Sequence, residues 1–403
     1  MFSVSRRREE ADLAGRSKFG PGFLVAAAFI GPGTVTSATM AGAGYGASLL
    51  WVVVVATLVA VIVQEMTGRF SLATGTDVAR ALVEYTSRRS QRITLQVLSF
   101  LAIVVGCAAY EAGNIMGGSL GLHLITGVGA RVWSVVIGGV AMVLLLWRKY
   151  RVIETLLIAL VVVMGVSFLL SAIIVRPDIS AILGGFVPRF PKGSVSLVLA
   201  LVGTTVVPYN LFLHSSTVLK KWRGEADIPV MRGDIILSVG LGGLITASIV
   251  VTASVTYFMQ GTAVSGPADL AAQLSPLYGP LAKLFFGIGF FAAGLSSAIT
   301  APYAASWTVA GLFGWREAER RFSLVSLGVL LFGTAVSFSA FRPLRLILMA
   351  QITNALLLPV VLLFLFYLLN KPVAGRGRNR WWQNLIFLLV WFVVLWINLK
   401  KFV

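Results

Sequence analysis

Residues 23–50 read FLVAAAFIGPGTVTSATMAGAGYGASLL, an apolar stretch interrupted in its middle by Gly31, Pro32, Gly33 and Thr34. Proline removes a backbone donor and the two flanking glycines hold helical dihedrals poorly, so a helix is expected to break here. In lipid, freed backbone groups persist only where protein or a polar cavity satisfies them. The break therefore predicts either a binding site at membrane depth or a simple proline kink.

The composition is that of a membrane protein. Hydrophobic residues make up 58% of the 403 residues and charged residues only 12%. Apolar runs of about 20 residues, each long enough to span a bilayer, recur along the whole chain. A porin-like barrel would need strands of alternating polarity, which the sequence lacks. We therefore predict an all-α polytopic fold with eleven transmembrane helices. Cys107 stands alone and the two histidines are far apart, so we expect no metal cluster, no cofactor and no enzyme activity.

The net charge of +18 is distributed in an alternating pattern. Most Lys and Arg residues fall in every second predicted loop, as the positive-inside rule describes. With eleven spans, this pattern predicts a cytoplasmic N-terminus and an extracellular C-terminus in a plasma membrane of the bacterial inner-membrane type. The basic residues are expected to face the lipid bilayer, and no nucleic acid is needed as a partner. In one such loop, Thr76-Asp77 is expected to cap a short helix through Tyr85.

A second proline-centred break, GTTVVPYN at residues 203–210, interrupts a later apolar span. Each break opens a group of five spans, and because five is odd, the two groups have opposite orientations in the membrane. This is the inverted repeat of secondary transporters, whose substrate sites lie between two discontinuous helices. The chain accordingly divides into a cytoplasmic tail (1–20), a first repeat (21–176), an extracellular loop (177–194), a second repeat (195–370), and a basic cytoplasmic loop with helix 11 (371–403).

Five segments resemble the Nramp family of divalent-metal transporters, and they occur in the family's order. They are GPGFLVAAAFIGPGT, QEMTGRFSLATG, GTTVVPYNLFLHSS, FFAAGLSSAITAPYAA and AQITNALLLP. The resemblance covers spans 1 to 10. It implies the 5+5 inverted-repeat (LeuT-type) fold with helices 1 and 6 broken at mid-membrane. It also implies a secondary active transporter that works by alternating access.

The same resemblance shows that the metal ligands of the family are missing. The family holds its ion with an Asp and an Asn of the first break, and here Gly31 and Thr34 stand at those positions. It adds a methionine sulfur and a backbone carbonyl from the sixth span, where this chain has Val207 and Thr204. Of the ion-binding side chains, only Gln351 in span 10 matches. A divalent ion at bilayer depth needs compensating charge, so transport of manganese or iron by the family mechanism is not expected.

The altered site is neutral, small and hydroxylated. The candidate substrate-binding residues are Gly31, Gly33, Thr34, Thr204, Val207, Tyr209, Asn210 and Gln351, with Thr36 and Thr205 beside them. Hydroxyl groups and backbone N–H groups at half-helix N-termini suit a small carboxylate or an amino-acid-like zwitterion. The alternative is a divalent ion that keeps its water shell, such as Mg²⁺, which dehydrates reluctantly. A transport-inactive sensor or scaffold is a more remote alternative.

Two coupling schemes remain open. The candidate coupling residues are Glu111, Asn114, His214, Ser296 and Ser297. The resemblance places Glu111 and Asn114 at acidic positions of the family's third span, and His214 at its second histidine. An acid inside a membrane span is costly without a partner and is commonly functional, which favours a proton as the co-transported ion. Ser296, Ser297 and Thr300 share one face of span 8, where they form either a sodium site or a helix–helix contact.

Overall fold

The structure, a computed structural model, describes residues 20, 30–147, 151–339 and 342–400, and within these ranges helices are the only regular secondary structure. The predicted N-terminal tail and the first half of the opening span, up to residue 29, lie outside these ranges apart from Gly20. Ten helical stretches in the described part are long and apolar enough to cross a membrane. The chain is therefore an all-helical membrane protein, as predicted.

Most of the helices correspond to predicted spans. The first group comprises α3 (Pro32–Tyr45), the 3₁₀ turn η1 (Gly46–Leu49), α4 (Leu50–Thr74), α5 (Val78–Glu84), α6 (Arg89–Thr126), α7 (Ala130–Trp147), α8 (Arg151–Ile174) and α9 (Ile179–Gly185). The second group comprises α10 (Val195–Thr205), α11 (Pro208–Lys221), η2 (Glu225–Asp227), α12 (Ile228–Ala253), the π-helical η3 (Ser254–Phe258), α13 (Pro267–Ala272), α14 (Ser275–Tyr278), η4 (Gly279–Leu281), α15 (Ala282–Phe313), α16 (Arg320–Ser337), α17 (Pro343–Leu369), η5 (Pro372–Gly377) and α18 (Trp381–Leu399).

Both breaks occur where the prolines predict them. Helix α3 begins at Pro32, and the sixth predicted span divides into α10, which ends at Thr205, and α11, which begins at Pro208. Proline is favoured at the first helical position because its missing N–H would have no intrahelical partner there. Pro208 thus starts α11 after the two non-helical residues 206 and 207, and Pro32 starts α3.

The predicted count of eleven spans is not confirmed. Helices α3 and α4 are joined by the single turn η1, so that residues 32–74 form one helical stretch of 43 residues rather than two separated spans. The outer loop predicted at 177–194 also contains a helix, α9, whose first turn is capped because the Asp178 side chain accepts a hydrogen bond from the Ser180 N–H.

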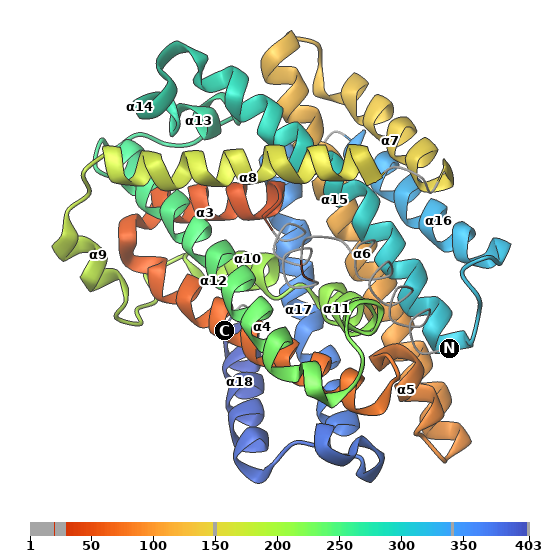
Figure 1. The fold of residues 1–403 in the computed structure, drawn as a ribbon. Helices are drawn as coiled ribbons and strands as arrows, with labels where there is room; N and C mark the ends of the chain where they lie inside the picture. The colour runs from red at the N-terminus through yellow and green to blue at the C-terminus, as the bar shows by residue number, and fades with distance from the viewer. Residues whose placement is uncertain (1–19, 21–29, 148–150, 340–341, 401–403) are drawn as a thin grey trace, which may run out of the picture.

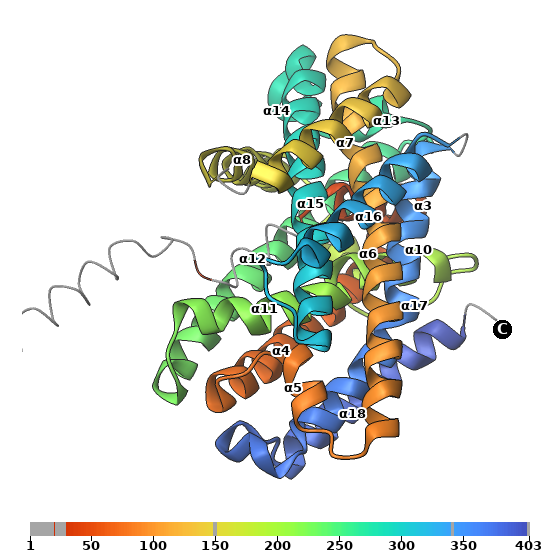
Figure 2. The ribbon, with the colours of Figure 1, turned by 90° about the vertical axis from the view of Figure 1, so that its right-hand side faces the viewer.

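Among the described elements, helices α6 and α15 share the most extensive contact, and they run side by side through the fold (Figures 1 and 2). Their backbones meet at glycines: a Cβ on Gly294 would lie 2.4 Å from the backbone nitrogen of Gly118. A Cβ on Gly121 would lie 2.5 Å from the carbonyl oxygen of Gly287. Small residues permit such approach between membrane helices. Beside this pair, α10 contacts both α3 and α17 at the centre of the molecule (Figure 1), so these three helices bring the two breaks together.

Candidate transport site

The two breaks are joined by a hydrogen bond between side-chain hydroxyls. Thr34 Oγ1 on α3 and Thr204 Oγ1 on α10 are 2.8 Å apart, and both residues are fully buried. Two positions that are 170 residues apart in the sequence therefore meet at one point. Thr36 and Thr205 are also buried, and the hydroxyl of Thr205 donates to the Leu201 carbonyl of its own helix.

Gln351 of α17 forms a third wall of the site. A Cβ on Gly33 would lie only 2.2 Å from Gln351 Nε2, and a Cβ on Gly203 would lie 1.9 Å from the Gln351 carbonyl oxygen. Position 203 therefore needs glycine, because the backbone of α17 is too close for a side chain there, whereas at Gly33 the neighbour is the buried end of the Gln351 side chain. The Gln351 amide nitrogen donates a long hydrogen bond of 3.4 Å to Ile347, and its Oε1 has no partner among the described residues.

The N-termini of two half-helices open at the site without side-chain caps. Gly31 is the N-cap of α3 and Val207 is the N-cap of α11, and neither position has a side-chain hydrogen bond to the helix. An uncapped helix N-terminus carries a partial positive charge and unsatisfied N–H groups. Asn210, one turn into α11, is buried and its amide has no hydrogen-bond partner among the described residues. Tyr209 packs edge-on against Tyr110 of α6 at 5.6 Å between ring centroids.

The chemical groups that surround the breaks are hydroxyls, amides and backbone. In the part of the chain that the structure describes, no group of three or more His, Cys, Asp or Glu residues could hold a metal ion. Val207, at the position where the family has its methionine, is buried and offers no donor atom. The site can thus supply neutral oxygen and nitrogen ligands, but no carboxylate or thioether.

Glu111 lies on the other side of α6, against α16. A Cβ on Gly333 of α16 would lie 2.5 Å from Glu111 Cγ. The glycine therefore leaves the space on α16 that the Glu111 side chain occupies. Glu111 is fully buried; Oε2 accepts a hydrogen bond of 3.5 Å from Asn114 Nδ2, and Oε1 has no partner among the described residues. The ion pairs that join Glu65 to Arg69 and to Arg232 do not involve this carboxyl group.

The remaining coupling candidates are separate from the two breaks. His214 is buried on α11 against Gly68 of α4, and neither ring nitrogen has a hydrogen-bond partner in the described part of the chain. On α15, the Ser297 hydroxyl is likewise buried without such a partner, whereas the Ser296 carbonyl accepts a hydrogen bond from Thr300. No hydrogen bond between described residues connects His214, Ser296 or Ser297 to Thr34 or Thr204.

A buried contact between Gln273 and Thr39, farther along α3 than the break, could not be seen in the sequence. Gln273, just after α13, is fully buried and its Nε2 donates to Thr39 Oγ1 of α3 at 2.7 Å. A polar residue in a short loop helix gives no signal in the sequence that it reaches a broken span.

A cavity of about 320 Å³ lies at the far end of α3, lined by residues including Tyr45, Asp178 and Phe258. Since a helix rises 1.5 Å per residue, it is roughly 20 Å from the break.

The chain is similar to proteins of a known family. The family model described as natural resistance-associated macrophage protein-like (Nramp) matches residues 22–403. A protein of Deinococcus radiodurans named divalent metal cation transporter MntH is 32% identical over 309 residues, which cover 73% of this chain and 69% of that protein.

Solved structures show the same fold. The manganese transporter of Eremococcus coleocola, in complex with an aromatic bis-isothiourea substituted compound, matches with a TM-score of 0.76 at 21% identity, over 95% of this chain and 85% of that one. A nucleobase-cation-symport-1 family transporter in a closed conformation matches with a TM-score of 0.58 at 16% identity, over 96% of this chain and 92% of that one.

Proposed function

The chain belongs to the Nramp family, and from this premise we propose that it is a secondary transporter whose cargo is a divalent cation that keeps much of its water shell. Mg²⁺ fits this description best, because it is a hard ion that dehydrates reluctantly and usually retains several waters. The relative and the structural neighbour are named as transporters of divalent metal and of manganese, which supports a cation as cargo.

The observation that carries the proposal is the neutral set of ligands that joins the two breaks. Thr34 and Thr204 share a hydroxyl–hydroxyl bond of 2.8 Å, and the Gln351 amide lies against Gly33, the residue before Thr34. Hydroxyl and amide oxygens can accept hydrogen bonds from the waters of a hydrated ion. A bare transition-metal ion would need a compensating carboxylate, and a softer ligand to select it, neither of which the described site offers.

From the sequence, a small carboxylate or zwitterion is the expected cargo and a hydrated divalent ion the alternative; here the hydrated ion comes first. A small carboxylate or zwitterion remains the second candidate, because one specific observation favours it. The uncapped N-termini of α3 and α11 both open at the site, and such ends bind anions.

For the coupling ion, we propose a proton carried by Glu111. This side chain is the buried carboxyl group on α6, three residues from Asn114 and outside any described ion pair. A carboxyl group in such a position can gain or lose a proton without disturbing a salt bridge. The sodium alternative through Ser296 and Ser297 has less support, since the Ser296 carbonyl already accepts the Thr300 hydroxyl within α15.

The test is uptake into proteoliposomes with Mg²⁺, Mn²⁺ and glycine as separate cargoes. Hexaamminecobalt(III), an inert octahedral ion that resembles hydrated Mg²⁺, should inhibit Mg²⁺ uptake if the ion crosses with its waters. Gln351→Ala should lower Mg²⁺ uptake by about tenfold, the equivalent of one buried hydrogen bond. Thr353→Ala is the matched control, because its hydroxyl bonds only to the Met349 carbonyl of the same helix.

Each outcome distinguishes the candidates. Uptake of Mg²⁺ that hexaamminecobalt(III) inhibits supports the proposal. Saturable Mn²⁺ uptake at micromolar concentration, without inhibition by that complex, would show that the site holds a dehydrated metal. Uptake of glycine but of neither ion would establish the second candidate.

A further inference from the structure

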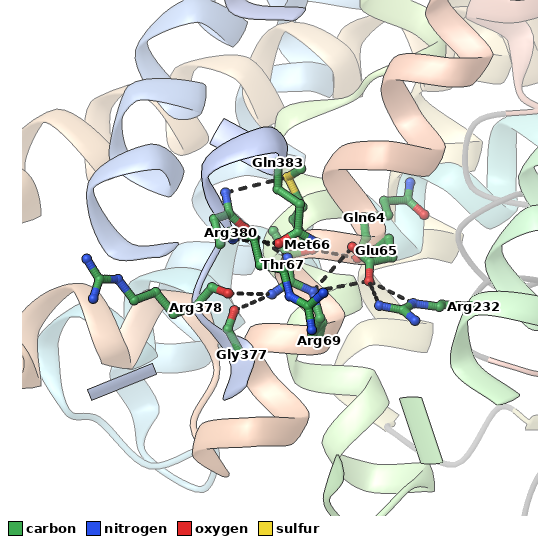
Figure 3. Close-up of polar contacts among 11 residues, drawn as sticks. Gln64, Glu65, Met66, Thr67, Arg69, Arg232, Gly377, Arg378, Arg380 and Gln383 are labelled. Atoms are coloured by element: carbon green, nitrogen blue, oxygen red, sulfur yellow. Dashed lines mark hydrogen bonds and ion pairs between the residues drawn. The ribbon is translucent and has the colours of Figure 1, made fainter. Parts of the chain in front are cut away.

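A buried arginine holds the loop that precedes the last helix. Arg69 of α4 is 4% exposed, and its Nη1 donates to the carbonyl oxygens of Gly377 and Arg378. Its Nη2 donates to Asn379 Oδ1 at 2.8 Å, and its Nε pairs with Glu65 at 3.1 Å (Figure 3). All three nitrogens of one guanidinium are therefore used, two of them to fix a segment that is some 300 residues away in the sequence.

The other side of the same loop is fixed by amide groups. Asn384 of α18 accepts hydrogen bonds of 3.1 Å from Asn370 and from Asn379, and donates to Asn370 at 2.6 Å. The Arg380 N–H donates to Gln383 Oε1 at 2.8 Å, which completes the start of α18. The backbone from residue 377 to 384 is therefore held in one conformation from both sides.

The residues that this loop presents outward are cationic and aromatic. Arg378 and Arg380 are exposed, and the next two residues, Trp381 and Trp382, are 79% and 42% exposed. Figure 3 shows the guanidinium of Arg378 directed away from the Arg69 contacts. Neither arginine is in an ion pair with a described carboxylate. We refer to Arg378, Arg380, Trp381 and Trp382 as the Arg–Trp cluster.

The rest of α18 fixes the depth of this cluster in the bilayer. Helix α18 packs on α17 at the edge of the fold (Figures 1 and 2), and its outer face carries Leu385, Leu389 and Phe392, each at least 60% exposed. An exposed apolar face of this length must lie among acyl chains. The two tryptophans one turn earlier then lie at the polar–apolar interface, where tryptophan is enriched. The two arginines reach the level of the lipid phosphates.

From this arrangement we propose that the Arg–Trp cluster is a binding site for the headgroup of an anionic phospholipid. Guanidinium groups bind phosphate oxygens in pairs, and the tryptophan rings pack against the glycerol and upper acyl carbons. Arg69 connects the site to α4, which packs against both α10 and α11. A lipid bound here is therefore attached, through one buried side chain, to a helix that contacts both halves of the second break.

The test compares the full-length protein in nanodiscs of phosphatidylcholine with and without phosphatidylglycerol. Native mass spectrometry counts retained phosphatidylglycerol, and thermal unfolding reports the stabilisation it gives. The variant is Arg378→Ala with Arg380→Ala, which keeps the backbone carbonyl that Arg69 binds. At about 1 kcal/mol per basic residue near an anionic surface, the double variant should lose roughly thirtyfold in affinity for phosphatidylglycerol.

The matched control is Arg88→Ala with Arg89→Ala, which removes two charges that are likewise exposed, from the start of α6, where no tryptophan pair is adjacent. It should retain the wild-type preference for phosphatidylglycerol. Equal unfolding temperatures in pure phosphatidylcholine show that both double variants are folded. The proposal is overturned if the Arg378/Arg380 variant keeps its preference, or if the control loses as much, because the effect would then be one of total charge.

Discussion

Gly33→Ala isolates the contact between the first break and α17. The new Cβ would lie 2.2 Å from Gln351 Nε2 and 2.4 Å from Gln351 Cδ, distances that no real side chain shows. Gln351 is 1% exposed, so its amide cannot swing into solvent to relieve the overlap. Overpacking of this kind costs about 1–3 kcal/mol. We therefore expect Gly33→Ala to be destabilised and to transport poorly.

Gly44→Ala is the internal reference for this effect. Gly44 lies in the same helix, and a Cβ there meets nothing within 4 Å. Both substitutions gain about 0.5–1 kcal/mol of helix propensity, so this contribution cancels when the two variants are compared. The difference in unfolding free energy between them should therefore equal the overpacking cost of about 1–3 kcal/mol.

The assay is thermal unfolding in detergent together with uptake of Mg²⁺ into proteoliposomes. The double variant Gly33→Ala with Gln351→Ala should unfold no earlier than Gln351→Ala alone, because the clashing amide has been removed. Mg²⁺ uptake should stay low in the double variant and in Gln351→Ala. If Gly33→Ala and Gly44→Ala unfold at the same temperature, the tight contact between Gly33 and the Gln351 amide is refuted.

Three further predictions concern polar groups around the site. Glu111→Gln should abolish cation-driven proton flux into proteoliposomes while Mg²⁺ still raises the unfolding temperature; unchanged flux removes Glu111 from the mechanism. Gln273→Ala leaves the buried Thr39 hydroxyl unpaired, at about 1–3 kcal/mol, and should speed amide hydrogen exchange in α13; unaltered exchange would mean that the bond does not hold that helix. Partial burial acts to raise the pKa of Asp269. Hydrogen bonds from Ser265 and from the Gly266 N–H outweigh this effect and lower the pKa below the usual value of about 3.9. Wild type should therefore exceed Asp269→Asn in stability by a constant amount above about pH 5, and this difference should shrink as the pH falls through the lowered pKa of Asp269, measured by unfolding temperature; a difference that grows as the pH falls contradicts this.

The sequence was most informative where structure depends on neighbouring residues. The breaks at Pro32 and Pro208 follow from the chemistry of proline, and both helices begin at these residues. The short helix expected after Thr76-Asp77 is α5, and the Asp77 side chain accepts a hydrogen bond from the Arg80 N–H as a cap should. The predicted number of eleven spans is not confirmed, because η1 joins two predicted spans without a polar loop to separate them.

The contacts that define the site could not be predicted in the same way. That Thr34 and Thr204 belong to one site was expected from the repeat, but the hydrogen bond between them depends on the packing of α3 and α10. The approach of Gln351 to Gly33, the bond from Gln273 to Thr39, and the bonds from Arg69 to residues 377–379 all join residues that are more than 200 positions apart. Such pairs leave no local pattern, so only the folded chain reveals them.

The glycine contacts between α6 and α15 have a consequence for how this protein could change over evolution. Because backbone atoms set the spacing of this pair at Gly118–Gly294 and Gly121–Gly287, no side chain there has to be repacked when other residues are replaced. α6 also touches the second break, because Tyr110 packs against Tyr209. A change of side chain at Gly31, Thr34 or Val207 nevertheless removes none of the backbone contacts between α6 and α15, so the spacing of this pair is set separately from the residues at those three positions.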